Sequence, residues 1–401
     1  MNIPITKPVF GPEELAAVQQ PLKDGWVVQG PYVKEFEAKF SRFTSAAHCI
    51  ATTSCTTALH IAVAALGLKP GDEVIVPAFT WISTANVVEY MGAKPVFCDI
   101  ELATFNIDPQ LVESLITPHT VGIIPVHLFG LCANMDVIQD VATRHHLWVV
   151  EDAACAFGAW YHDRHAGTFG DAGCFSFHPR KSITTGEGGM ITTAGNDLEA
   201  LARTLRDHGA SRTDLARHEG QGSFLLAEYK FLGYNYRMTD LQAAVGCVQM
   251  DRAESILADR RRLAERYDGL LGDIDALALP RVPAGYRHGY QAYVTLFQPE
   301  QPTLANVRRL HADRNRVMAE MEQAGIATRQ GTHAPVLQNY YADKYHLRPN
   351  DFPNSLIADR LTLALPLYPQ MTDEEQDRVC DSLRHAVHSN RAESPTRVPD
   401  N

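Results

Sequence analysis

The amino-acid sequence predicts an α/β fold, with a large domain built on a mostly parallel sheet between helices and a smaller C-terminal α+β domain. Strand-like and helix-like segments alternate through the first half of the chain. The strands are near-continuous apolar runs, as in parallel sheets covered on both faces. From about residue 256 the pattern changes to short segments separated by prolines. We expect the large domain over residues 1–255, the small domain over residues 256–388 and a disordered tail over residues 389–401.

The spacing of apolar residues locates the elements of the large domain. A short helix is expected over residues 12–23, and helical spacing resumes from Tyr32. The sequence then predicts strands over residues 49–52, 73–77, 95–100, 121–126 and 147–151, and helices over residues 57–66, 83–90, 109–116 and 135–145. Ligands of such sheets bind beyond the carboxyl ends of the strands, so residues that follow these strands are the first candidates for function.

The second half of the chain contains fewer regular signals. Residues 239–242, Thr-Asp-Leu-Gln, form a capping box that opens a long helix, and we expect this helix to continue through the charged run 251–266 as a bridge out of the large domain. A strand over residues 290–297 and a helix over residues 304–324 are expected in the small domain.

Composition and charge restrict the compartment and the partners. Lysine and arginine total 36 against 47 acidic residues, a formal charge of −11, which argues against a nucleic-acid or anionic-membrane surface. No stretch approaches the length of a membrane span, and the first residues do not form a signal peptide. The eight cysteines are scattered without a CxxC pair, as expected of reduced thiols in a cytoplasmic protein. No metal site is expected, because His162 and His165 have no third ligand at a recognisable spacing.

Lys181 lies in a short link between two strands that both look buried. Burying an ammonium group is expensive, so a lysine at this place needs a reason. A desolvated lysine loses its proton more readily and can form a Schiff base with a carbonyl. The alternative, a turn lysine that points into water, is the more common situation for a lysine considered alone.

Asp152 ends a core strand at the mouth of the predicted sheet. It could cap a helix. Together with Lys181 it suggests pyridoxal phosphate, which needs a lysine for covalent attachment and a carboxylate against its pyridine nitrogen. Residues 53–57, Thr-Ser-Cys-Thr-Thr, lie between a strand and a helix, where hydroxyls and free amides can bind a phosphate, although an ordinary helix cap would explain one of them. Ser176 adds a hydroxyl, and Trp81 follows another strand and could stack on a pyridine ring or belong to the core.

As a set, several segments resemble the DegT/StrS-type family of nucleotide-sugar aminotransferases. They are residues 56–59 (TTAL), 70–77 (PGDEVIVP), 151–154 (EDAA), 175–181 (FSFHPRK), 184–189 (TTGEGG), 233–238 (GYNYRM) and 365–369 (LPLYP). The segments occur in the same order as in the family, and the resemblance covers most of residues 10–385. It implies the fold type I aminotransferase architecture and a homodimer whose active sites are shared across the interface.

The resemblance also implies a role for each candidate residue around the cofactor. Lys181 would form the internal aldimine with pyridoxal phosphate, Asp152 would bind the pyridine nitrogen, and Trp81 would stack on the ring. The phosphate would be held by Cys55, Thr56 and Ser176, and by Asn235 of the neighbouring subunit.

Two cysteines and three further residues complete the set. Cys55 stands where the family often has glycine or alanine, and Cys155 where glutamine or histidine is common, so Cys155 would pack against the ring without a hydrogen bond. Candidates for substrate contacts are His127, Arg237 and His333, of which the two histidines could equally be structural.

The implied reaction moves an amino group from an amino acid, glutamate by resemblance, to a nucleotide-linked keto-deoxyhexose. The product would be an amino sugar for a polysaccharide such as a lipopolysaccharide O-antigen, or for a glycosylated metabolite. Some members of the family replace the lysine by histidine and are sugar dehydratases, so Lys181 favours transamination. A keto-cyclitol acceptor and a dehydratase outcome remain alternatives. A non-catalytic cofactor-binding regulator is a further alternative, which the lysine–aspartate pair argues against.

Overall fold

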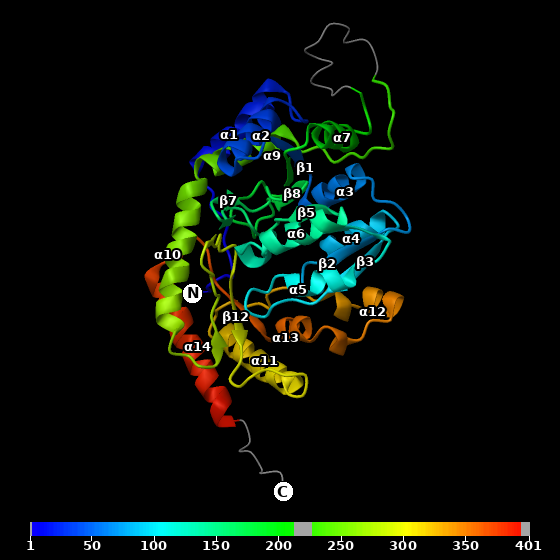
Figure 1. Cartoon of the computed structure of the whole chain (residues 1–401). Helices are drawn as coiled ribbons and strands as arrows, with labels where there is room; N and C mark the ends of the chain where they lie inside the picture. The colour runs from blue at the N-terminus through cyan, green and yellow to red at the C-terminus, as the bar shows by residue number, and fades with distance from the viewer. Residues whose placement is uncertain (1, 212–226, 394–401) are drawn as a thin grey trace.

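The structure is a computed structural model that describes residues 2–211 and 227–393 (Figure 1). Its large domain contains a seven-stranded sheet with the order β1–β9–β8–β5–β4–β2–β3. The strands are β1 (His48–Thr52), β2 (Glu73–Pro77), β3 (Lys94–Cys98), β4 (Thr120–Ile123), β5 (Trp148–Asp152), β8 (Ala172–Ser176) and β9 (Gly189–Thr193). Neighbouring strands from β8 through β3 pair in parallel, whereas β9 is antiparallel to both β1 and β8. The predicted mostly parallel sheet is therefore confirmed.

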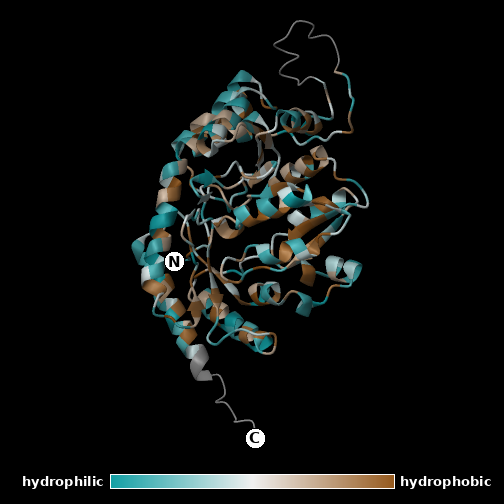
Figure 2. Cartoon of the chain, viewed as in Figure 1, coloured by the Kyte–Doolittle hydropathy of each residue, from teal (hydrophilic) through white to brown (hydrophobic). Residues whose placement is uncertain are grey.

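Helices cover both faces of this sheet. In the large domain they are α1 (Pro12–Asp24), α2 (Pro31–Thr44), α3 (Cys55–Ala65), α4 (Ser83–Tyr90), α5 (Pro109–Val112), α6 (Met135–His145), α7 (Asn196–Arg206) and α9 (Asp240–Asp251), with the 3-10 turns η1 (Glu113–Leu115) and η2 (Leu128–Gly130). Alternate residues of β2 belong to different apolar cores, Val74 and Val76 to one and Ile75 to the other. This follows from the two-residue period of a strand, and it explains why the strands read as continuous apolar runs. Figure 2 shows the apolar residues gathered on these central strands.

The small domain is formed by a three-stranded antiparallel sheet and the helices around it. The sheet has the order β10 (Leu277–Ala278), β12 (Tyr293–Phe297), β13 (Thr362–Leu365). The helices are α10 (Ala253–Leu271), α11 (Val307–Gln323), α12 (Asn339–Tyr345), α13 (Pro353–Leu361) and α14 (Asp373–Glu393), with the turns η3 (Pro335–Leu337) and η4 (Pro349–Asp351). A second small sheet joins β6 (Trp160–Tyr161), β7 (Arg164–His165) and β11 (Tyr286–Arg287), and so connects residues of the two predicted domains.

The expected domain boundaries need two corrections. The N-terminal residues pack on the small domain, because Ile3 pairs with Ile326, its amide donates to Gly325 O at 2.8 Å, and its side chain is buried in the core of that domain. The tail expected to be disordered from residue 389 is helical as far as Glu393, since extending an existing helix costs little once its first turns are fixed. Residues 394–401 lie outside the described part of the chain.

The bridge between the domains consists of two helices instead of the single one predicted. α9 begins at the predicted capping box, where the Thr239 side chain accepts a hydrogen bond from the amide of Gln242, and ends at Asp251. Arg252 separates the two helices with φ −99° and ψ 0°, and its guanidinium forms an ion pair with the buried Glu14 of α1 at 3.0 Å. α10 then runs along one side of the molecule towards the small domain (Figure 1). Among the described residues, none of the helices has the length and apolarity needed to cross a bilayer.

A buried ion pair ties the helices to the edge of the sheet that precedes the predicted phosphate loop. Arg206 of α7 is 2% exposed and donates to Glu37 of α2 at 2.8 Å and to Ala51 O of β1 at 2.7 Å. Glu37 also accepts a hydrogen bond from the amide of Ala51 at 2.8 Å and pairs with Arg203 at 2.8 Å. These contacts fix the end of β1, and therefore the position at which residues 53–57 begin.

Replacing Arg206 by alanine should lower the free energy of unfolding by about 3 kcal/mol. This is the low end of the range for a broken buried ion pair, because Glu37 would still be paired with Arg203. Urea denaturation followed by circular dichroism measures this loss. The matched control is Arg144→Ala, which removes a solvent-exposed pair with Glu113 and should change the free energy of unfolding much less, because water screens the interaction. Equal losses in the two variants would contradict this account of the sheet edge.

Candidate functional site

The predicted lysine and aspartate both lie at the carboxyl edge of the parallel sheet. Asp152 ends β5, Lys181 follows β8, and these two strands are neighbours in the sheet. The Lys181 Nζ lies 3.1 Å from Sγ of Cys155, which stands in the turn directly after Asp152. An amine and a carboxylate that are distant in the sequence are thus brought to one side of the sheet, as the sequence predicts.

Asp152 is a buried carboxylate, 4% exposed, that is held in a fixed orientation. Its Oδ2 accepts a hydrogen bond from the Thr84 hydroxyl at 2.8 Å, and its Oδ1 accepts one from the amide of Ala154 at 3.1 Å. Burial raises the pKa of Asp152, while these hydrogen bonds and the charge of Lys181 oppose the rise. Within residues 2–211 and 227–393, no basic side chain forms a salt bridge with Asp152. A buried carboxylate in this state fits a cationic partner such as a protonated pyridine nitrogen.

Lys181 is half-buried in a hairpin that the strands β8 and β9 close. Burial lowers the pKa of Lys181, but Cys155, Cys55 and Asp152 raise it, and the balance lies above the ordinary value. The amine is therefore an ammonium at neutral pH in this environment. The hairpin packs closely on the loop after β1: a Cβ on Gly189 would lie 2.3 Å from Ser54 O, so this position has to be glycine.

The loop after β1 forms the N-terminus of α3, as the hydroxyl cluster predicts. Ser54 caps the helix by accepting from the amide of Thr57 at 3.2 Å, and Thr57 returns a hydrogen bond from its hydroxyl. Thr56 donates to Ser83 at 2.9 Å, and the buried Cys55 turns its Sγ inward to Cys174 O at 3.4 Å. Amides in the first turn of a helix have no intrahelical partner and favour an anion. A phosphate contact by Cys55 would thus come from its amide and not from its thiol.

Trp81 and His333 lie together beside this site. Trp81 is 59% exposed, so it does not belong to the core. Its ring centroid lies 6.0 Å from that of His333, and the amide of Thr80 donates to His333 O at 3.0 Å. Because His333 is in the C-terminal domain, that domain contributes to the site. The proposed contacts of these two residues with cofactor and substrate stay predictions, as does the phosphate contact of the half-buried Ser176.

The segment around Asn235 runs beside the end of β1. The amide of Thr53 donates to Tyr236 O at 3.0 Å, and Arg237 forms a bridge with Thr52. The guanidinium of Arg237 is paired with Asp207, whereas Asn235 is exposed. Both residues lie near the phosphate loop, and their expected contacts stay predictions.

The expectation that His127 lines the substrate pocket is corrected by its position. Its side chain is completely buried, with no exposed surface. Its Nδ1 accepts the amide of Ala133 at 3.0 Å, so the proton must be on Nε2, which donates to Glu151 at 2.7 Å. Glu151 also accepts the amides of Gly167, Phe169 and Gly170. His127 is therefore a structural residue that orders the loops behind Asp152.

Thr84 is a site residue that the sequence reasoning missed. It lies in the first turn of α4, a helix that the apolar pattern predicts correctly over residues 83–90. Its hydroxyl contacts Asp152, Thr80 Oγ1 at 3.0 Å and Trp81 O at 3.1 Å. The sequence offers only a weak signal for it, namely two threonines spaced by four residues, Thr80 and Thr84, in the segment that follows β2.

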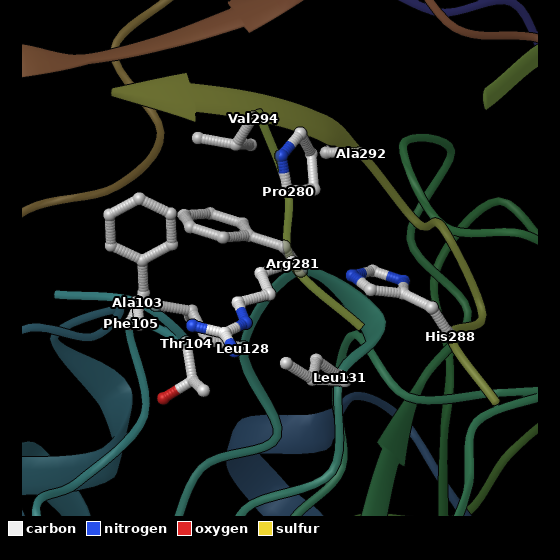
Figure 3. Close-up of a pocket in the computed structure, with 11 residues that line it drawn as sticks. Ala103, Thr104, Phe105, Leu128, Leu131, Pro280, Arg281, His288, Ala292 and Val294 are labelled. Atoms are coloured by element: carbon white, nitrogen blue, oxygen red, sulfur yellow. The ribbon is translucent and has the colours of Figure 1, made fainter. Parts of the chain in front are cut away.

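A separate cavity lies at the seam between the domains and does not belong to this site. Its lining includes Thr104, Phe105, Arg281 and His288 (Figure 3). With about 10 Å³ of space it has room for about one water molecule. Burial lowers the pKa of His288 to about 3, and its Nδ1 accepts the amide of Tyr290 at 2.8 Å, so this histidine is neutral.

The fold and the site define a class of protein. A carboxylate and a lysine at the carboxyl edge of a mostly parallel sheet, next to a helix N-terminus, are the arrangement of a fold type I enzyme that uses pyridoxal phosphate. The chain belongs to the DegT/DnrJ/EryC1/StrS aminotransferase family, which it matches over residues 8–384. It is a pyridoxal-phosphate-dependent sugar aminotransferase.

Individual relatives agree with this assignment. The chain is 38% identical to the spore coat polysaccharide biosynthesis protein SpsC of Bacillus subtilis over 385 residues, 96% of this chain and 97% of the relative. Its structure is similar to that of the putative sugar aminotransferase Spr1654 from Streptococcus pneumoniae in the PMP form, with a TM-score of 0.89 and 28% identity over 97% of this chain and 100% of that one. The aminotransferase PseC of Helicobacter pylori, at 23% identity, shares the fold with a TM-score of 0.89 over 97% of this chain and 100% of its own.

Replacing Thr84 by valine should weaken the binding of pyridoxal phosphate roughly 10- to 100-fold, because a hydrogen bond to a charged group contributes about 1.5–3 kcal/mol. Titration of the cofactor-free protein, followed by absorbance, measures the affinity. Thr80→Val is the matched control, since it removes a hydroxyl that contacts Thr84 but not Asp152. Equal losses in both variants would show that Thr84 acts only by packing.

Proposed function

We propose that the enzyme transfers an amino group from L-glutamate to a nucleotide-linked keto-deoxyhexose, and that the amino sugar is used to build a polysaccharide. Membership of the family supports an amino acid as donor and a sugar as acceptor. The similarity to SpsC, which is named for spore coat polysaccharide biosynthesis, supports a polysaccharide as the destination. The resemblance of the sequence motifs to nucleotide-sugar aminotransferases supports a nucleotide-linked acceptor and glutamate as the amino donor.

One observation carries the chemistry: Asp152 ends β5, Lys181 follows the neighbouring strand β8, and Cys155 contacts the lysine amine at 3.1 Å. Pyridoxal phosphate, when bound, supplies an electron sink for the carbon that loses its proton. Asp152 would keep a proton on the pyridine nitrogen, and Thr84 would hold the carboxylate in that orientation. Lys181 Nζ, once released from the cofactor, would move a proton between the substrate carbon and the cofactor.

We also propose that two copies of the chain form the working enzyme. Exposed apolar side chains gather near the site segments, including Trp81 (59%), Tyr229 (66%), Phe231 (52%) and Leu232 (89%). The last three lie three to six residues before Asn235 in the sequence. A second copy that covers them would remove apolar surface from water and would bring Asn235 to the partner's phosphate. The eight free thiols support a reducing compartment such as the cytoplasm.

Replacing Lys181 by alanine should abolish transfer of labelled nitrogen from L-glutamate to any acceptor, because the proton-transferring amine is lost. Mass spectrometry of products from a panel of nucleotide-linked keto-sugars and keto-cyclitols measures the transfer and distinguishes these acceptors. Lys94→Ala, which removes a surface lysine paired with Glu73, is the control and should retain activity. Normal transfer by the Lys181→Ala protein would sink the proposed function.

A shared site predicts complementation between two variants. Asn235→Ala should weaken cofactor binding roughly 10- to 100-fold, as expected for a lost hydrogen bond to a phosphate. In a mixed dimer with Lys181→Ala, one of the two sites would have both the lysine and the asparagine intact. Mixing the two proteins at limiting cofactor should therefore restore activity that neither has alone. Failure of the mixture to recover activity, in subunits shown by light scattering to exchange, would argue that Asn235 serves its own subunit.

A further inference from the structure

The contact between Lys181 and Cys155 joins two nucleophiles that transamination does not need to have side by side. Their Nζ and Sγ atoms are 3.1 Å apart. Cys155 stands in a turn after β5, and Lys181 lies in the hairpin after β8, so neither backbone is part of a helix or strand at that point. A four-carbon lysine side chain can close the remaining distance to the sulfur by rotation about its own bonds.

Cys155 also differs from every other cysteine in its access to solvent. All eight cysteines lie in the described part of the chain, and seven are buried while Cys155 is half-buried. Burial raises the pKa of each of these seven thiols, which are Cys49, Cys55, Cys98, Cys132, Cys174, Cys247 and Cys380. Small oxidants attack accessible thiols first. Oxidation of this protein should therefore begin at the cysteine that touches Lys181.

We propose that Cys155 and Lys181 form a reversible covalent cross-link when a hydroperoxide oxidises Cys155. The thiol sulfur first attacks the peroxide, which converts Cys–SH and HOOH to Cys–SOH and water. The Lys181 ammonium then releases a proton to solvent, and the resulting neutral amine displaces the sulfenic hydroxyl as a second water, so that an N–S bond forms and the S–O bond breaks. The product is a sulfenamide, Cys–S–NH–Lys, the link that sulfenic acids form with nitrogen nucleophiles. Two equivalents of a thiol reverse it, giving back Cys–SH and Lys–NH2 together with a disulfide.

The cross-link would occupy the nitrogen that has to bind the cofactor. Lys181 Nζ cannot bond to the sulfur and to pyridoxal phosphate together, so the bound cofactor protects the pair and the cross-link excludes the cofactor. Oxidation would therefore trap the protein that has lost its cofactor. This inference does not depend on which sugar or donor the enzyme uses.

The test treats the cofactor-free full-length protein with hydrogen peroxide and maps its proteolytic peptides by mass spectrometry. We expect a peptide pair joined through Cys155 and Lys181, with a mass two hydrogens below the sum of the reduced peptides. Dithiothreitol should separate the pair and restore the absorbance change on adding pyridoxal phosphate. Prior addition of pyridoxal phosphate should prevent the cross-link.

Three variants identify the atoms. Cys155→Ser and Lys181→Ala should each lack the cross-link, and Lys181→Ala should accumulate oxygen on Cys155 instead. Cys55→Ser should still form it, because the Cys55 sulfur faces Cys174 O at 3.4 Å. Three results with the unsubstituted protein would overturn the proposal: peroxide leaves Cys155 unchanged, peroxide adds only oxygen to Cys155, or peroxide joins Cys155 to Cys55 as a disulfide. Because the readout is a peptide mass without substrate, its failure would leave the transamination assay as an independent result.

Discussion

Burial of the Asp152 carboxylate is the constraint on which the rest of the site depends. An ionised group without a counter-charge is expensive in a protein interior. The Thr84 hydroxyl, the Ala154 amide, the Cys55 thiol at 4.0 Å and the charge of Lys181 offset part of that cost for Asp152. A positively charged ring nitrogen supplies the missing partner. At the end of this central strand the backbone of Asp152 is held from both sides, by its pairing with Cys174 of β8 and by a bridge to Val126.

Sheet order then determines which side chains can reach the same cofactor. β8 and β5 are adjacent, so the residues that follow them emerge together, and the lysine hairpin is pressed against the loop after β1 at Gly189. The C-terminal domain approaches from the other side, where His333 meets Trp81. Strands, loops and domain thus converge on one edge, in agreement with the general rule that open α/β sheets bind ligands beyond their carboxyl ends.

Much of this could be predicted from the sequence, because the relevant signals are local. Continuous apolar runs identified the parallel strands, and hydroxyls before a helix identified the N-terminus of α3. What could not be predicted depends on contacts between distant segments. Thr84 is ordinary in its own helix and becomes important only because Asp152 lies 2.8 Å from its hydroxyl. Ile3 joins the small domain by pairing with Ile326. His127, which the sequence suggested for substrate binding, is buried and hydrogen-bonded to Glu151.

The two cysteines beside the cofactor site lie in different environments, although the sequence presents them as equivalent departures from the family. Cys55 is 8% exposed and turns its sulfur towards a backbone carbonyl, so burial keeps it a thiol that fills space. Cys155 is half-buried, and its sulfur lies 3.1 Å from the Lys181 amine. A glutamine or histidine at this position would have no sulfur to oxidise. Cysteine at position 155 therefore places an oxidisable sulfur in contact with the lysine that is expected to bind the cofactor.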